Sequence, residues 1–315
     1  MSEKGKTARF LPLPGLGNED CGRVYRLWAP RAPQVPVIFS SPHSGRCYPV
    51  DFVRASPLSV ESLRASEDLF VDGLFMAAPE AGCWLLAAQR PRVWLDLNRG
   101  ADELTPQMFA DAPAQAHKHV SERAAAGLGV IPQVVTEGRE IYAHRLSWAE
   151  AQARIRDYWR PYHHKLQELT LTAMARFGAA VVIDCHSMPE SAARAMTPLS
   201  LRQPEIILGD REGTSCAALV TDVLERLFKD AGFVVRRNRV YTGGYITQSY
   251  GLRGLGAHAI QIEINRRLYQ RPGSFAPGEA FFTLAETIGA IVRALPEKLK
   301  PLWEERASDC PAAAE

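Results

Sequence analysis

Short, continuous apolar runs separated by long helical stretches constrain the fold of this chain more than any other feature. A run such as Val181-Val182-Ile183 shows no polar alternation, which is expected of a strand buried on both faces. The predicted strands are Val35–Ser40, Cys83–Ala88, Arg92–Leu95, Ala180–Asp184, Ile206–Leu208, Phe233–Arg236 and Ala259–Ile264. The predicted helices are Val60–Ala78, Ser147–Ala175, Thr214–Ala231 and Gly278–Ala294. This alternation favours an α/β sandwich around a largely buried sheet.

The organisation of the chain is predicted to be simple. No internal repeat and no linker interrupts residues 20–305, so we predict one domain spanning residues 1–315. Within it, residues 1–20 form a loose arm and residues 307–315 a frayed tail. The hydrophobic periodicity of residues 101–146 is weak, which predicts long loops with a hairpin. Long loops in a compact domain are often functional.

Charge and hydropathy exclude several classes of partner. The formal net charge is +2 and no run of Lys and Arg occurs, so a nucleic-acid partner is not expected. The segment Met1–Thr7 lacks the apolar core of a signal peptide, and the longest apolar runs, such as Ala179–Ile183, are too short to span a bilayer. Six scattered cysteines without a C-x-x-C pair indicate reduced thiols in a cytoplasmic protein rather than a disulfide framework.

Two histidines follow apolar strands. His43 comes soon after Val35–Ser40, and His186 soon after Val181-Val182-Ile183. Ligands of open α/β sheets bind at the carboxyl ends of strands, so the two histidines can share one site. Zinc commonly takes two histidines and one carboxylate and keeps one position for water.

The third ligand is expected from the acidic segment that ends at Asp72. This segment lies in the first predicted helix, where Asp68 and Asp72 are one turn apart on the same face and Glu67 points elsewhere. Asp68 is therefore the preferred carboxylate ligand, and Glu67 is the alternative.

Two further elements offer groups for recognition and catalysis. Arg99 presents a planar fork that suits a substrate carboxylate, and Asn98 adds an amide donor. Glu263 lies between two isoleucines, where an unpaired carboxylate has a raised pKa that suits a general base. The structural alternatives are a turn at residues 96–99 and a salt bridge between Glu263 and the cations of residues 266–267.

Eight short motifs occur in order between about residues 35 and 270. They are Ser-Pro-His-Ser-Gly (41–45), Glu-Asp-x-x-x-Asp (67–72), Asp-Leu-Asn-Arg (96–99), Asp-x-His-Ser (184–187), Ile-Leu-Gly-Asp (207–210), Gly-Gly-Tyr-x-Thr (243–247), Tyr-Gly (250–251) and Gln-x-Glu (261–263). Each is weak alone, but the ordered set resembles the N-formylglutamate amidohydrolase family, which is related to zinc carboxypeptidases and aspartoacylases.

The resemblance implies a three-layer α/β sandwich with a mixed, roughly eight-stranded sheet flanked by helices. It also implies one zinc ion held by His43, Asp68 and His186, with Glu263 as the general base.

Substrate recognition follows from the same resemblance. Arg99 and Asn98 would grip a substrate carboxylate, and Arg92 would stabilise the oxyanion by analogy with aspartoacylase. Tyr245 and Thr247 are further candidates for contact with the substrate.

The implied reaction is the hydrolysis of N-formyl-L-glutamate to formate and L-glutamate, a step of histidine degradation. The partner would be a small molecule with a free carboxylate. The alternatives are an amidase or esterase for another N-acyl amino acid, or a non-catalytic metal- or amino-acid-binding relative. Glu263 argues against the last, because binding alone requires no base.

Overall fold

The computed structural model describes residues 10–11, 21–32, 34–117, 120–135, 138–198, 200–271 and 273–304. The chain divides into two compact units, each assembled from three separate segments. The first unit comprises Met1–Tyr25, His43–Glu67 and Ala88–Tyr162, and the second unit comprises Arg26–Pro42, Asp68–Ala87 and His163–Glu315. No single linker separates the two units, because the chain passes between them several times. That the whole chain forms one domain stays a prediction.

The second unit is built on a mixed sheet. Among the described residues this sheet has seven strands, in the order β2-β5-β3-β6-β9-β7-β8. The strands are β2 (Tyr25–Trp28), β3 (Val37–Ser41), β5 (Trp84–Ala88), β6 (Ala180–Met188), β7 (Ile206–Gly209), β8 (Val235–Arg237) and β9 (Ala257–Asn265). Strands β5, β3, β6 and β9 run parallel to one another, β7 is antiparallel to β9, and β8 is parallel to β7.

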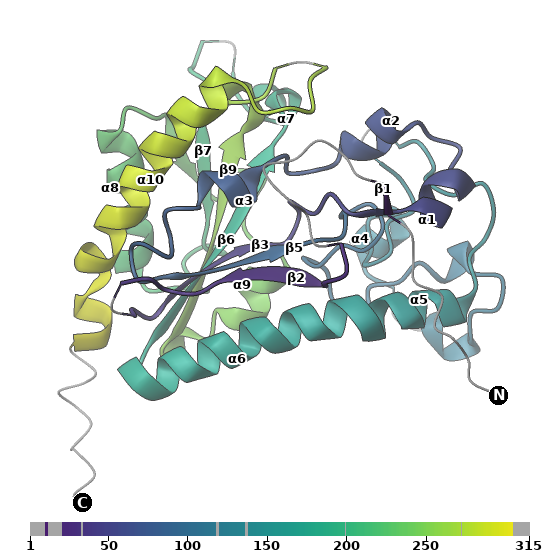
Figure 1. Ribbon diagram of the computed structural model, residues 1–315, viewed down its shortest axis with the longest axis horizontal. Helices are drawn as coiled ribbons and strands as arrows, with labels where there is room; N and C mark the ends of the chain where they lie inside the picture. The colour runs from purple at the N-terminus through teal and green to yellow at the C-terminus, as the bar shows by residue number, and fades with distance from the viewer. Residues whose placement is uncertain are drawn as a thin grey trace, which may run out of the picture. The chain divides into compact units, whose positions relative to one another are not determined.

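Helices cover both faces of this sheet, as Figure 1 shows for α10 and α6. The helices of the second unit are α3 (Val71–Leu74), α6 (Arg160–Phe177), α7 (Glu190–Ala195), α8 (Ala218–Asp230), α9 (Tyr245–Tyr250), η4 (Arg253–Leu255), η5 (Arg266–Leu268) and α10 (Glu279–Leu299). All nine residues of β6 and of β9 are buried, as expected for central strands between two helical layers. The three-layer α/β sandwich is confirmed, with seven described strands where the prediction was about eight.

The first unit contains short elements joined by long loops. They are β1 (Phe10–Leu11), β4 (Tyr48–Pro49), α1 (Val50–Ala55), α2 (Val60–Arg64), η1 (Pro106–Met108), η2 (Ala114–His117), α4 (Glu122–Ala125), α5 (Trp148–Arg154) and the π-helical segment η3 (Ile155–Trp159). Strands β1 and β4 pair antiparallel. The predicted hairpin within residues 101–146 appears as one antiparallel bridge, between Val134 and Glu140.

Two of the predicted elements are wrong in type or extent. The predicted helix Val60–Ala78 is broken into α2 and α3, because Phe70 takes a left-handed backbone conformation with φ 57° just before α3. The predicted strand Arg92–Leu95 is a turn, in which the amides of Trp94 and Leu95 donate to the carbonyl of Pro91. The predicted helix Ser147–Ala175 is confirmed as one continuous helical run made of α5, the π-helical η3 and α6.

The prediction that the cysteines are reduced thiols is also wrong for one pair. Cys21 and Cys47 form a disulfide that closes 26 positions of the chain. The described free cysteines Cys83, Cys185 and Cys216 are buried, and Cys310 lies outside the described residues. None of the described helices combines the length and hydropathy needed to cross a membrane.

Candidate active site

His186 lies on β6 between two carboxylates of the second unit. Its Nδ1 is 2.9 Å from Oδ2 of Asp68, and its Nε2 is 2.9 Å from Oδ2 of Asp184. All three side chains are buried. Burial acts to lower the pKa of His186, but Asp184 and Asp68 outweigh it and raise that pKa well above its ordinary value. The imidazole is therefore fixed by carboxylates at both ring nitrogens.

Asp68 lies in the turn between α2 and α3, not inside a helix as predicted. Its Oδ1 accepts a hydrogen bond of 3.0 Å from Nη2 of Arg266, whose Nε donates to Oγ of Ser187. The left-handed residue Phe70 packs its ring against Phe281 of α10 at 6.0 Å, which holds the turn in place. The ion pair between Arg266 and Asp68 was not predicted from the sequence, because no local pattern links two residues 198 positions apart.

Glu263 lies on β9 directly opposite His186 in the parallel register of β6 and β9. Neighbouring strands are about 4.8 Å apart and paired residues point to the same face, so the carboxylate and the imidazole share one face of the sheet. Gln261, two residues earlier on that face, donates from Nε2 to Oε1 of Glu263 at 2.7 Å. The Gln-x-Glu spacing thus places a donor that orients the carboxylate.

His43 belongs to the first unit and follows β3 by two residues. Its Nε2 is 2.6 Å from Oδ1 of Asp96, which also accepts from the amide of Asn98 at 2.8 Å. Nη2 of Arg92 donates to Oδ2 of Asp96 at 3.0 Å. Burial acts to raise the pKa of Asp96, but His43, Arg92 and Arg99 together hold it well below its ordinary value. Asp96 is therefore a buried anion that orients the imidazole of His43.

The positions of His43 and His186 along the chain can be compared through the register of strands β3 and β6. The parallel register of β3 and β6 pairs Ser40 with Asp184. His43 follows Ser40 by three residues, and His186 follows Asp184 by two. His43 therefore follows the end of β3, as predicted, whereas His186 lies inside β6, two residues before the strand ends.

Gly45 of the Ser-Pro-His-Ser-Gly motif is required by a close approach of the backbone. A Cβ at this position would collide with the carbonyl of Arg90. Beside it, the amide of Cys47 donates to the carbonyl of Gln89 at 2.8 Å. The segment after His43 is therefore held against the segment that leads to Arg92 and Asp96.

Arg99 is held in a fixed orientation within the first unit. Its Nε donates to the carbonyl of Leu128 at 2.9 Å, and its Nη1 donates to the carbonyl of Asn98 at 2.8 Å. Its own carbonyl accepts from Nε1 of Trp159, in η3. These backbone contacts set the plane of the Arg99 guanidinium.

Tyr245 and Thr247, both on α9, lie in different environments. Tyr245 is half-buried, and the buried ring of His163 packs edge-on against it at 5.2 Å. Thr247 is fully buried and its hydroxyl donates to the carbonyl of Gly244 at 2.8 Å, so it holds the loop before α9. Contact of either residue with a substrate stays a prediction.

Glu67, the alternative metal ligand, lies in a buried network of the first unit. Nε of Arg64 donates to both oxygens of Glu67, at 3.1 and 3.2 Å, and the hydroxyl of Tyr48 donates to Oε1 at 2.7 Å. Burial raises the pKa of Glu67, and Arg64 and Tyr48 oppose this rise. These contacts give Glu67 a structural role and favour Asp68 as the ligand.

Comparison with known proteins gives consistent results. The family model for N-formylglutamate amidohydrolase matches residues 35–270. An N-formylglutamate deformylase of Pseudomonas aeruginosa is 30% identical over 283 residues, which cover 87% of this chain and 96% of the relative. The crystal structure of an N-formylglutamate amidohydrolase from Ralstonia eutropha JMP134 superposes with a TM-score of 0.82 at 35% identity, covering 88% of this chain and 98% of that one. A gene product of Agrobacterium tumefaciens shares the fold, with a TM-score of 0.60 at 19% identity and coverages of 88% and 98%.

Proposed function

This chain belongs to the N-formylglutamate amidohydrolase family and hydrolyses N-formylglutamate, and we propose that it does so with one divalent metal ion held by His43, Asp68 and His186. The reaction breaks the formyl amide and releases formate and L-glutamate. The observation that carries the metal proposal is the pairing of each candidate imidazole with a buried carboxylate.

These residues fit a metal by the chemistry of their donor atoms. Asp96 lies at Nε2 of His43, and Asp184 lies at Nε2 of His186. Metal-binding histidines usually donate one ring N–H to a carboxylate, a backbone carbonyl or a water, which fixes the ring and makes the other nitrogen a better ligand. Nδ1 of each ring would then bind the ion, with Asp68 as the third ligand.

Zinc is the ion that we propose, since two imidazoles and one carboxylate are a common catalytic zinc set. A bound divalent ion would supply Lewis acidity, which polarises an acyl oxygen and makes a coordinated water more acidic.

Glu263 would be the general base that transfers the proton of the attacking water. Its carboxylate accepts a proton from the attacking water and returns it to the nitrogen that leaves as the amine of glutamate. Gln261 donates to Oε1 of Glu263 and keeps the carboxylate oriented. Arg92, anchored to Asp96 at one nitrogen, would donate to the oxyanion that develops on the formyl oxygen.

Arg99 and Asn98 would hold a carboxylate of the substrate and so set the position of the scissile amide. Support comes from the two backbone carbonyls that fix the guanidinium of Arg99 before any substrate binds.

Replacing Arg99 with lysine tests this clamp. Arg99→Lys keeps the charge but loses the planar pair of donors, so kcat/KM for N-formyl-L-glutamate is expected to fall about 10- to 100-fold, mainly through KM. Steady-state kinetics on the variant and on Arg123→Lys, an exposed control in the first unit, measure the effect. An analogue of N-formyl-L-glutamate in which the carboxylate bound by Arg99 is an amide should be a poor substrate of the native enzyme. Its kcat/KM should fall little further in Arg99→Lys. Equal losses for both compounds would count against the clamp.

The roles of the neighbouring acids Glu67 and Asp68 can be separated. Asp68→Asn should lose stoichiometric zinc, because the site loses its anionic ligand. Glu67→Gln should keep zinc but lower the free energy of unfolding by about 3–5 kcal/mol, because Arg64 is left buried without its partner. Elemental analysis and urea unfolding of both variants measure these effects. Zinc lost from Glu67→Gln and kept by Asp68→Asn would show that the assignment is reversed.

The substrate is tested by a product-detected screen of N-formyl and N-acetyl amino acids on the zinc-loaded protein. Formate release from N-formyl-L-glutamate should exceed the release of product from every other compound. A faster reaction with a different N-acyl amino acid or ester would favour the alternative amidase or esterase. No turnover of any compound by the folded, zinc-loaded protein would favour the non-catalytic binding protein.

The physiological setting also stays a prediction. Histidine degradation is the proposed context, and a small molecule with a free carboxylate is the proposed partner, with no nucleic acid. A cytoplasmic location was predicted from the scattered cysteines, and the Cys21–Cys47 disulfide weighs against it, since disulfides are rare in reducing compartments.

A further inference from the structure

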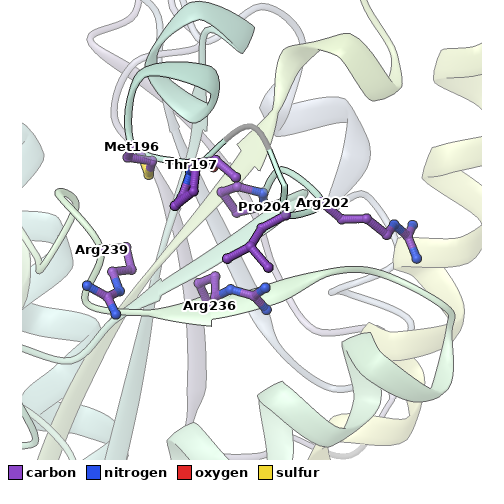
Figure 2. Close-up of a pocket in the computed structure, with 8 residues that line it drawn as sticks. Met196, Thr197, Arg202, Pro204, Arg236 and Arg239 are labelled. Carbon is purple, nitrogen blue, oxygen red and sulfur yellow. The ribbon is translucent and has the colours of Figure 1, made fainter.

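A pocket of about 260 Å³ lies in the second unit. Figure 2 shows it between the loop that carries Met196, Thr197, Arg202 and Pro204 and the strand that carries Arg236, with Arg239 just beyond the strand end. None of the residues that line it is a proposed ligand, base or clamp residue. Its volume is just below the usual range for small-molecule sites, so it suits a ligand smaller than a typical cofactor.

The lining combines three cations with an apolar floor and contains no acid. Arg236 and Arg239 are exposed and take part in none of the ion pairs found among the described residues. Arg202 approaches Glu205 at only 3.9 Å. That carboxylate already accepts from Nη2 of Arg267 at 2.6 Å and from the amide of Val234 at 2.9 Å. The pocket therefore carries an excess of positive charge.

An apolar barrier separates this pocket from Glu263. Ile207 of β7 pairs with Glu263 on one side and with Arg236 on the other, so the three residues form one row on the same face of the sheet. Ile207 is fully buried, with Met196 and Tyr241 packed against its cluster. Ile207 therefore lies between Arg236 and Glu263 in this row.

The arginines are spread along the pocket and do not converge on one point. In Figure 2, Arg236 lies between Arg239 on the left and Arg202 on the right. A ligand with one compact anionic group would meet only part of this charge, whereas an extended ligand with an anion at each end would meet more of it. Guanidinium groups bind carboxylates through charge-assisted hydrogen bonds, and the floor of Met196 and Pro204 would contact an apolar middle.

We propose that this pocket is a second binding site that takes a small, extended dicarboxylate. The carboxylates contact the arginines of the pocket, and the aliphatic chain between them lies on the apolar floor. This site goes beyond the proposed hydrolysis and does not depend on it.

Calorimetric titration of the zinc-loaded protein with glutarate tests the proposal. Saturable binding of glutarate is expected, with butyrate and glutaramide at least about tenfold weaker, because each lacks one or both charges. These comparisons use the native protein, so they hold even if a variant fails to fold. Arg236→Gln and Arg239→Gln should each weaken glutarate binding about tenfold.

Two control variants complete the experiment. Arg226→Gln removes an exposed cation of α8 that does not line the pocket, and Arg99→Lys alters the proposed substrate clamp; neither should change the affinity for the pocket. The proposal is overturned if native protein shows no saturable binding, if butyrate binds as well as glutarate, or if Arg99→Lys abolishes binding that Arg236→Gln and Arg239→Gln leave intact. The titration needs no turnover, so a failure of the catalytic proposal would be seen separately, as lost formate release.

Discussion

Glu263→Gln is expected to lower kcat for N-formyl-L-glutamate by about 10²- to 10⁴-fold, the usual contribution of one positioned acid–base group. The glutamine keeps the shape of the side chain, and its amide oxygen can still accept from Nε2 of Gln261. It cannot take a proton from water. The variant should therefore fold, keep zinc and bind substrate with nearly native KM while the chemical step fails.

Glu205→Gln is the matched control for this experiment. Glu205 is also a buried glutamate of the second unit, but it serves Arg267 and the amide of Val234. Its substitution should lower the melting temperature and leave kcat per folded molecule nearly unchanged. If Glu263→Gln behaves in that way instead, with near-native turnover in a zinc-loaded protein, Glu263 is a structural residue and the proposed mechanism fails.

His186→Ala and His43→Ala are each expected to abolish stoichiometric zinc binding and to reduce formate release to background. Each substitution removes one of three proposed protein ligands, and two ligands make an inadequate catalytic site. His186→Ala also leaves Asp68 and Asp184 without the imidazole that lies between them. We therefore expect a loss of stability in that variant.

The exposed His164 of α6 supplies the control, since His164→Ala changes the histidine count without touching the site. Zinc content by elemental analysis, circular dichroism and formate release should be measured on one preparation of each variant. Full zinc occupancy in a folded His43→Ala or His186→Ala protein would remove that residue from the ligand set.

Much of the candidate site could be predicted because it depends on residues that follow strands. Apolar runs locate β3, β6 and β9, and the polar residues at their ends then share one edge or face of the sheet. His43 and His186 were found by this argument, whereas Glu263 was found from its position between two isoleucines of an apolar strand. The choice of Asp68 over Glu67 was made on helical geometry, although Asp68 lies in a turn.

Other features depend on contacts that sequence patterns do not carry. Asp68 is held by Arg266, which lies 198 positions away. The left-handed conformation of Phe70 breaks the predicted first helix. A phenylalanine in the sequence does not predict a positive φ, and here the ring contact with Phe281 stabilises this conformation. The pairing of Cys21 with Cys47 likewise follows from tertiary proximity, not from the spacing of the cysteines.

Reconstitution with zinc tests the central claim most directly. The native protein would be stripped with a chelator, shown to be metal-free and folded, and titrated with zinc while formate release from N-formyl-L-glutamate is followed. A single site made of His43, Asp68 and His186 predicts background activity without metal, a linear rise, and a plateau at one zinc per chain. Native turnover by protein shown to be metal-free would contradict it.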